Sequence, residues 1–159
     1  MNSIKNDSEP GRDDVWPPFR VLCVDDNRDC AESAAMLLKV SGFDSRFCFD
    51  GETALLLNDS FRPAICFIDL NMPGMNGYEL ASRLRTTVGW KPMLLIAVTA
   101  MSDEANRIRV TAAFDMHLIK PVAPEKLVQV VNLLFRIADS SETPAVCRSA
   151  VADDGWKLL

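Results

Sequence analysis

The chain is poor in the residues that build zinc centres and disulfide frameworks. Its 159 residues include one histidine, His117, and an odd number of cysteines, and no two cysteines have the C-x-x-C spacing. This pattern suggests neither a disulfide framework nor a zinc site. The cysteines are Cys23, Cys30, Cys48, Cys66 and Cys147.

Long apolar segments are also missing. No apolar run approaches the ~18–20 residues that span a bilayer, and the polar N-terminus lacks the apolar core of a signal peptide. The net charge of −5 argues against nucleic acid as the main partner, because phosphate backbones select basic surfaces. We therefore expect a cytoplasmic protein that binds neither membranes nor nucleic acid.

The length of the chain favours a single domain. Residues 1–18 are polar and offer little to bury, so we expect a flexible N-terminal arm. Residues 139–159 carry several serines and acidic residues, and we expect a loose tail there. The folded unit should then cover residues 19–138.

Short apolar runs alternate with segments of helical periodicity five times along residues 19–138. Strands separated by helices predict an α/β fold with a parallel sheet. We expect strands at 20–24, 45–49, 64–68, 93–98 and 116–119, and helices at 28–40, 52–58, 78–87, 103–113 and 124–138.

Polar side chains stand just past the ends of four of these strands. In an open parallel sheet, ligands bind at the carboxyl ends of the strands, so we expect these side chains to share one edge. They are Asp25 and Asp26, Asp69, Thr99, and Lys120.

The expected cluster suits a magnesium ion and a phosphoryl group. Carboxylates about 4 Å apart repel by roughly 4 kcal/mol at an effective dielectric constant near 20, so positive charge must compensate. Lys120 supplies one charge, and Mg²⁺, which prefers oxygen ligands, supplies two. Asp69 stands alone and is the best nucleophile for an aspartyl phosphate, whereas Asp25 and Asp26 resemble a metal-binding pair. The backbone carbonyl of Asn71 could complete the metal shell.

Four motifs in the right order resemble those of a response-regulator receiver domain of two-component signalling. The resemblance covers about residues 19–138. The motifs are Val21–Asn27 (VLCVDDN), Phe67–Gly77 (FIDLNMPGMNG), Val98–Ala100 (VTA) and Lys120–Pro121.

The resemblance implies a flavodoxin-like (βα)5 fold, a doubly wound parallel sheet with strand order 2-1-3-4-5. It implies that Asp26, Asp69 and the Asn71 carbonyl bind Mg²⁺, while Asp25 holds a metal-bound water. Thr99 and Lys120 would contact the phosphoryl oxygens. The Lys120–Pro121 bond would be cis, a form nearly confined to X-Pro bonds.

The implied role is a regulatory phosphoacceptor rather than an enzyme. Asp69 would take its phosphoryl group from a phosphohistidine on a sensor histidine kinase or a histidine phosphotransfer protein. His117 is the only histidine, so the donor should be another protein. The switched state would be recognised by a protein target on the face of the fourth helix, fifth strand and fifth helix. The protein would be a monomer or a weak dimer through helices four and five.

Three positions depart from the family pattern, namely His117, Asn76, which stands where Asp is common, and Ala113. His117 stands where a switch residue, usually Tyr or Phe, swings inward on activation, and we expect it to be a weaker switch together with Thr99. Ala113 replaces a usual glycine and would be strained if its φ were positive. Met101 could shield the phosphoryl group from water, which predicts a long-lived phosphorylated state.

Three other functions remain open at this point. The chain could be a receiver fragment of a hybrid histidine kinase, or a pseudo-receiver that binds partners without phosphorylation. A haloacid-dehalogenase-type enzyme would need an Asp-x-Asp motif after the first strand. Here Asp25 and Asp26 are adjacent, which argues against that class.

Overall fold

The computed structural model describes residues 19–87, 93–100 and 104–139, and it describes no side chains for 104–108 and 138–139. The expected arm at 1–18, the tail at 140–159 and Met101 lie outside these ranges. Asp139, expected to begin the tail, is the last residue of the final helix.

Five strands and five helices alternate along the described chain, and all five strands pair in parallel. The strand order is β2-β1-β3-β4-β5. Both observations confirm the predicted α/β, flavodoxin-like fold with strand order 2-1-3-4-5. The strands are β1 (Arg20–Val24), β2 (Asp44–Cys48), β3 (Ile65–Asp69), β4 (Leu94–Thr99) and β5 (Met116–Ile119); the helices are α1 (Arg28–Val40), α2 (Gly51–Phe61), α3 (Gly77–Thr86), α4 (Glu104–Ala113) and α5 (Pro124–Asp139).

Two strands extend one residue further than the sequence predicts. Asp69 and Thr99, expected just after their strands, are the last residues of β3 and β4. The parallel ladder continues to them because Asp69 pairs with Val98, and Thr99 pairs with Ile119. Their backbones are therefore fixed by the sheet rather than by a loop.

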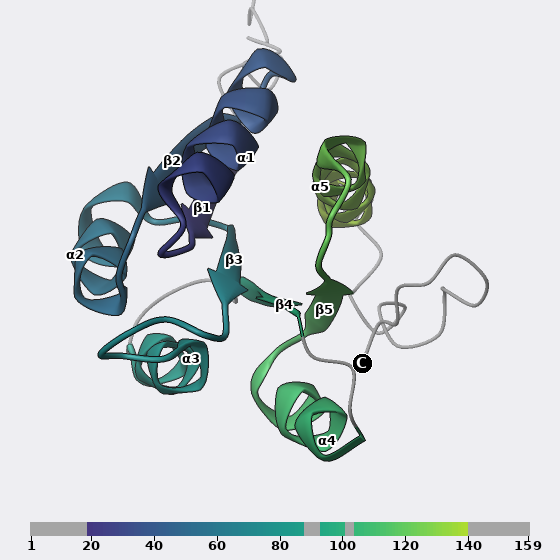
Figure 1. The fold of residues 1–159 in the computed structure, drawn as a ribbon. Helices are drawn as coiled ribbons and strands as arrows, with labels where there is room; N and C mark the ends of the chain where they lie inside the picture. Colours follow the sequence, from purple (N-terminus) through teal and green to yellow (C-terminus); the bar gives the residue numbers. More distant parts are fainter. Residues whose placement is uncertain (1–18, 88–92, 101–103, 140–159) are drawn as a thin grey trace, which may run out of the picture.

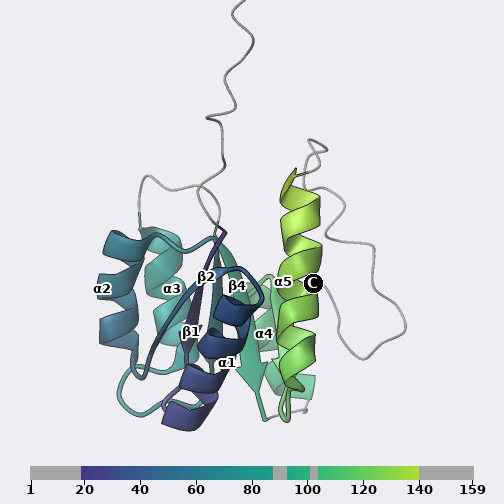
Figure 2. The same cartoon turned by 90° about the horizontal axis from the view of Figure 1, so that it is seen from above.

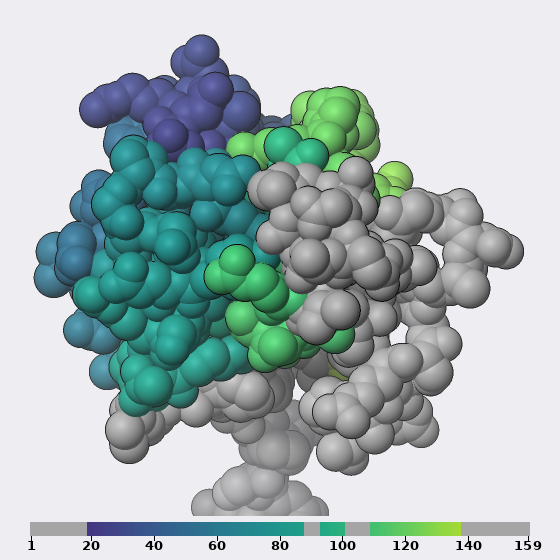
Figure 3. Space-filling model, turned by 60° about the horizontal axis from the view of Figure 1, so that its bottom comes forward, coloured from purple at the N-terminus to yellow at the C-terminus, as the bar shows by residue number. Residues whose placement is uncertain are grey.

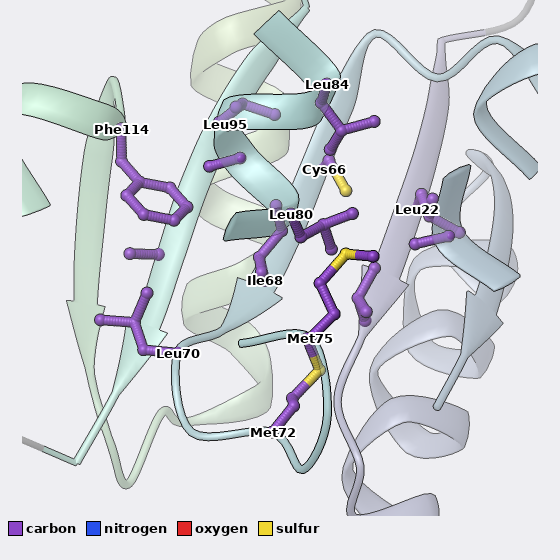
Figure 4. Packing of buried hydrophobic residues seen from close by; sticks show 14 of the residues in the cluster. Leu22, Cys66, Ile68, Leu70, Met72, Met75, Leu80, Leu84, Leu95 and Phe114 are labelled. Carbon is purple, nitrogen blue, oxygen red and sulfur yellow. The ribbon is translucent and has the colours of Figure 1, made fainter. Parts of the chain in front are cut away.

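The helices cover both faces of the sheet. Helices α1 and α5 lie together on one face, and α2, α3 and α4 lie on the other (Figures 1 and 2). In Figure 3, teal atoms of α3 lie beside green atoms of α4 on the second face. Each face has its own apolar core, because side chains of successive strand residues alternate between the faces. Figure 4 shows the core beneath α2, α3 and α4.

Asparagine and aspartate side chains cap the first three helices. The Asn27 side chain accepts from the amide of Cys30 at the start of α1, at 3.3 Å. Asp50 caps α2 and Asn76 caps α3 in the same way. Asn27 satisfies the start of α1, so the carboxylates of Asp25 and Asp26 are not needed as caps.

The strain expected at Ala113 is absent. Among the described residues other than glycine, only Arg62 has a positive φ, of 57°, and it ends α2 in the left-handed conformation. Ala113 closes α4 with ordinary backbone angles, and the amide of Phe114 donates to the carbonyl of Val110. The helix therefore ends here without the conformation that would favour glycine.

Candidate functional site

Three carboxylates converge at the carboxyl edge of the sheet. Strands β1 and β3 are neighbours, with Val24 paired to Ile68, so the residues that follow or end them lie close together. One oxygen from each of Asp25, Asp26 and Asp69 lies within 4.8 Å of the other two. The structure thus brings together the acidic residues that the sequence singles out.

Lys120 reaches this cluster from the end of β5. Its Nζ lies 2.9 Å from Asp25 Oδ2 and 3.5 Å from Asp69 Oδ2. Burial lowers the pKa of Lys120. The hydrogen bond to Asp25 and the charges of Asp25 and Asp69 have the opposite and larger effect, so the pKa is raised above its ordinary value. Lys120 is therefore a cation that neutralises only one of the three carboxylates.

Asp69 is the most buried carboxylate of the cluster. Asp69 is only 6% exposed. The pKa of Asp69 is raised mainly by burial and also by Asp25 and Asp26, whereas Lys120 and the Asn71 amide lower it. A divalent cation would relieve this charge imbalance, and the all-oxygen donor set fits Mg²⁺ rather than a softer metal.

Backbone amides orient two of the carboxylates. The amide of Asn27 donates to Asp25 Oδ1 at 2.9 Å, and the amide of Asn71 donates to Asp69 Oδ1 at 3.4 Å. In both residues Oδ1 faces the following loop and Oδ2 faces Lys120. The loops after β1 and β3 therefore set the direction of the carboxylates.

The two predicted switch residues, Thr99 and His117, lie on the neighbouring strands β4 and β5. Thr99, the last residue of β4, is 2% exposed. Its carbonyl accepts a hydrogen bond of 2.8 Å from the backbone amide of Lys120. The Lys120–Pro121 bond is cis, as the resemblance implies. His117 lies within β5, half-buried and paired with Ala97, so it is two strand positions from Ile119, the partner of Thr99.

A groove of about 660 Å³ opens beside the cluster, between α1 and the start of α5. Cys23, Phe67 and Val98 of the sheet form part of its lining, and Asp25 and Lys120 reach it from the site. The sequence gives no sign of this groove, because it depends on how far apart two helices pack on the sheet.

Two glycines also shape the site, although the sequence pattern does not single them out as site residues. Gly77 and Gly51 are buried, and a side chain at either would collide with the segment that follows Asp69. Their sequence context predicts only a turn and a helix start. Close approach of distant backbone is not visible in a single sequence.

The arrangement of the acidic cluster agrees with the protein family that the sequence matches. Residues 21–132 match the family described as response regulator receiver domain. The chain belongs to this family. Receivers of this kind are regulatory phosphoacceptor domains of two-component systems and not enzymes in the usual sense.

Relatives include response regulators from mycobacteria. The DNA-binding response regulator MtrA of Mycobacterium tuberculosis (strain ATCC 25618 / H37Rv) is 33% identical over 120 residues, covering 76% of this chain and 52% of that protein. The response regulator MprA of Mycobacterium sp. (strain KMS) is 34% identical over 128 residues, covering 80% of this chain and 55% of that protein. The chain spans about half the length of the curated relatives it matches.

Solved structures show the same fold. The chemotaxis protein CheY4 of Vibrio cholerae superposes with a TM-score of 0.69 at 24% identity, over 74% of this chain and 98% of that one. A response regulator from Chloroflexus aurantiacus J-10-fl gives a TM-score of 0.68 at 30% identity, over 76% and 99% of the two chains. Within residues 19–87, 93–100 and 104–139, no helix has the length and apolar character to cross a membrane.

Proposed function

We propose that Asp69 accepts a phosphoryl group from the phosphohistidine of a sensor histidine kinase or a histidine phosphotransfer protein. The supporting observation is that three carboxylates lie within 4.8 Å of one another, and that two of them, Asp25 and Asp69, contact the Lys120 ammonium. Asp69 is the most buried of the three. The cluster has an excess of negative charge and only oxygen donors. Phosphoryl transfer depends mainly on positioning and on neutralising charge, which such a site can supply.

Each residue has a defined part in the proposed transfer. An oxygen of Asp69 attacks phosphorus as the bond from phosphorus to the histidine nitrogen breaks, and that nitrogen keeps the electron pair. Lys120 and the Thr99 hydroxyl hold the transferred oxygens. Asp26, Asp69 and the Asn71 carbonyl would hold Mg²⁺, with Asp25 on a metal-bound water, and the bound ion would neutralise the developing charge.

The proposed output is a change in protein binding, or transfer of the phosphoryl group to another protein. Thr99 and His117 would rearrange once Asp69 is phosphorylated, and a target would recognise the face of α4, β5 and α5. The same face would support at most a weak dimer. MtrA is described as DNA-binding, but the matched region is about half of that protein. For this chain, with its net charge of −5, we propose protein partners in the cytoplasm.

Phosphoryl uptake from a small phosphodonor with Mg²⁺, followed by intact mass, tests this function. Wild type should gain one phosphoryl group, and Asp69→Asn should gain none because the attacking oxygen is lost. Asp59→Asn, at an exposed position of α2, is the matched control and should behave as wild type.

Absence of uptake in folded wild type, with Mg²⁺ present, would contradict the proposal and support a pseudo-receiver. The chemistry would be the same in a receiver that belongs to a hybrid histidine kinase. The length of the native gene product separates that case from a single-domain regulator.

A further inference from the structure

The segment between β3 and α3, residues 70–76, packs onto the core through its apolar side chains. We call it the acceptor loop. Three of its side chains, Leu70, Met72 and Met75, are buried and belong to the core beneath α2, α3 and α4. Figure 4 shows both methionines among the buried side chains of this face. The loop also carries the Asn71 amide, which donates to Asp69 Oδ1.

The base of the acceptor loop closes at Gly77. The amide of Gly77 donates to the carbonyl of Leu70 at 3.1 Å. A Cβ atom at Gly77 would lie 2.5 Å from the carbonyl oxygen of Asp69 and 2.8 Å from the Cα of Leu70. Both are backbone atoms, so any side chain at this position must push Asp69 and Leu70 away. The φ of Gly77 is not in the positive range, so close approach alone requires glycine here.

Met75, near the end of the acceptor loop, lies against the start of α2. A Cβ atom at Gly51 would lie 2.5 Å from Sδ and 3.0 Å from Cβ of Met75. The Met75 side chain is flexible at its sulfur end, so part of this collision can be relieved by rotation. A side chain at Gly51 should therefore displace the loop less than one at Gly77.

We propose that Gly77 and Gly51 are positioning residues for phosphoryl acceptance. The space left by their missing side chains sets where the Asp69 carboxylate and the Asn71 carbonyl stand. This inference rests on the proposed function of Asp69. It adds that the geometry of the acceptor is fixed from the α2–α3 side, by contacts with the Asp69 backbone and with Met75 rather than with the reacting carboxylate.

A series of three glycine-to-alanine variants tests the proposal. Gly74 lies in the same loop, with φ of 74° and no atom within 4 Å of an added Cβ. Gly74→Ala therefore strains the backbone without pushing on Asp69, and it is the matched control for Gly77→Ala and Gly51→Ala. The measurements are Mg²⁺ affinity by calorimetry, the uptake rate at saturating Mg²⁺, the melting temperature, and the amide NMR shifts of Asp69 and Asn71 without metal.

Gly77→Ala should slow uptake by about a hundredfold, the loss typical of a displacement near 1 Å. It should also weaken Mg²⁺ binding and shift both amide resonances. Gly51→Ala should change the same quantities in the same direction by a few-fold. Gly74→Ala should lower the melting temperature yet leave the uptake rate within about twofold of wild type, because stability and positioning are separate effects.

The outcomes separate this inference from the proposed function. Wild type without uptake would defeat the proposed function itself. Wild-type uptake with unchanged rates in Gly77→Ala and Gly51→Ala would overturn only the positioning role, as would equal slowing in Gly74→Ala. If Gly77→Ala does not fold, the comparison of Gly51→Ala with Gly74→Ala decides.

Discussion

The two faces of the sheet differ in how closely they are packed around the site. On the side of α2, α3 and α4, the acceptor loop is packed into the core through Met72 and Met75 and leaves no room for side chains at Gly51 and Gly77. On the side of α1 and α5, a groove of about 660 Å³ reaches Asp25 and Lys120. One face is filled as far as the segment that follows Asp69, and the other has a groove beside Asp25 and Lys120.

This difference suggests that the two faces serve different needs of the proposed function, one for rigid positioning and the other for access. A phosphoacceptor must be held rigidly, because transfer depends on geometry, yet it must be reached by another molecule. On the proposed function, the packed face would hold Asp69 in place, and the groove would bring another molecule close to Asp25 and Lys120. Three predictions test how far the two faces differ.

The largest expected effect is on thiol labelling. Cys30 is exposed at the start of α1, whereas Cys23, Cys48 and Cys66 are buried. Burial raises the pKa of Cys23 and Cys48 to about 12, which further suppresses the reactive thiolate. In a Cys147→Ser background, Cys30 should react with an alkylating reagent at least about a thousandfold faster than the buried thiols, which need an opening of the fold.

Cys23 gives the sharpest comparison in that experiment, because it lines the groove while remaining only 3% exposed. Mass mapping of the labelled peptides identifies each site, and the denatured protein, where all four thiols should react, is the control. Labelling of Cys23 as fast as Cys30 would show that the groove admits the reagent as far as the sheet, and it would contradict the predicted protection of Cys23.

The second effect concerns packing on the two faces. Leu80 of α3 is 0% exposed, whereas Leu127 of α5 is 8% exposed and lines the groove. Leu80→Ala should lower the free energy of unfolding by about 3 kcal/mol, because a closed cavity remains. Leu127→Ala should cost roughly half as much, since it enlarges an existing opening. Urea denaturation measures both, and equal losses would show that the groove side is as tightly packed as the other.

The smallest effect is electrostatic and depends on pH. The pKa of Asp69 in the fold is raised above its ordinary value of 3.8, chiefly by burial. A raised carboxyl pKa has no effect on stability below 3.8 and lowers stability progressively as pH rises through the folded pKa. Metal-free Asp69→Asn should therefore match wild type at low pH and be more stable by on the order of 1 kcal/mol near neutrality.

Magnesium should reverse this ranking near neutral pH. Binding to the folded state stabilises wild type by mass action, while the variant has lost one ligand and gains less. Thermal unfolding with and without Mg²⁺ measures both arms, and Asp59→Asn reports the effect of removing an exposed carboxylate. A wild type that is more stable than Asp69→Asn without metal would show that Lys120 outweighs the burial of Asp69.

The sequence predicts the fold well because its pattern is unambiguous. Short, strongly apolar runs such as Ile65–Ile68 favour buried strands, and Gly42, with φ of 97°, follows the end of α1 in the conformation typical of glycine. The predicted site residues Asp25, Asp26, Asp69 and Lys120 meet in space because strand ends in a parallel sheet share an edge. Their chemical roles remain predictions for the experiments above.

Other features could not be predicted because they depend on distances between segments far apart in the chain. Asp69 and Thr99 lie inside their strands because neighbouring strands extend far enough to pair with them. Arg62 ends α2 with a positive φ, although a glycine is more usual at such a position. The collisions at Gly51 and Gly77 involve Met75 and Asp69, which no local pattern connects to them.

The hydrogen bond from the amide of Lys120 to the carbonyl of Thr99 has a mechanical consequence. The two residues proposed to hold the phosphoryl oxygens are joined through their main chains, so neither can shift along the sheet without drawing the other. A displacement of the end of β4 would therefore pull on the end of β5 through this bond. A signal that begins at Thr99 would then have a main-chain route to the outer edge of the sheet, in addition to the proposed rearrangement of Thr99 and His117.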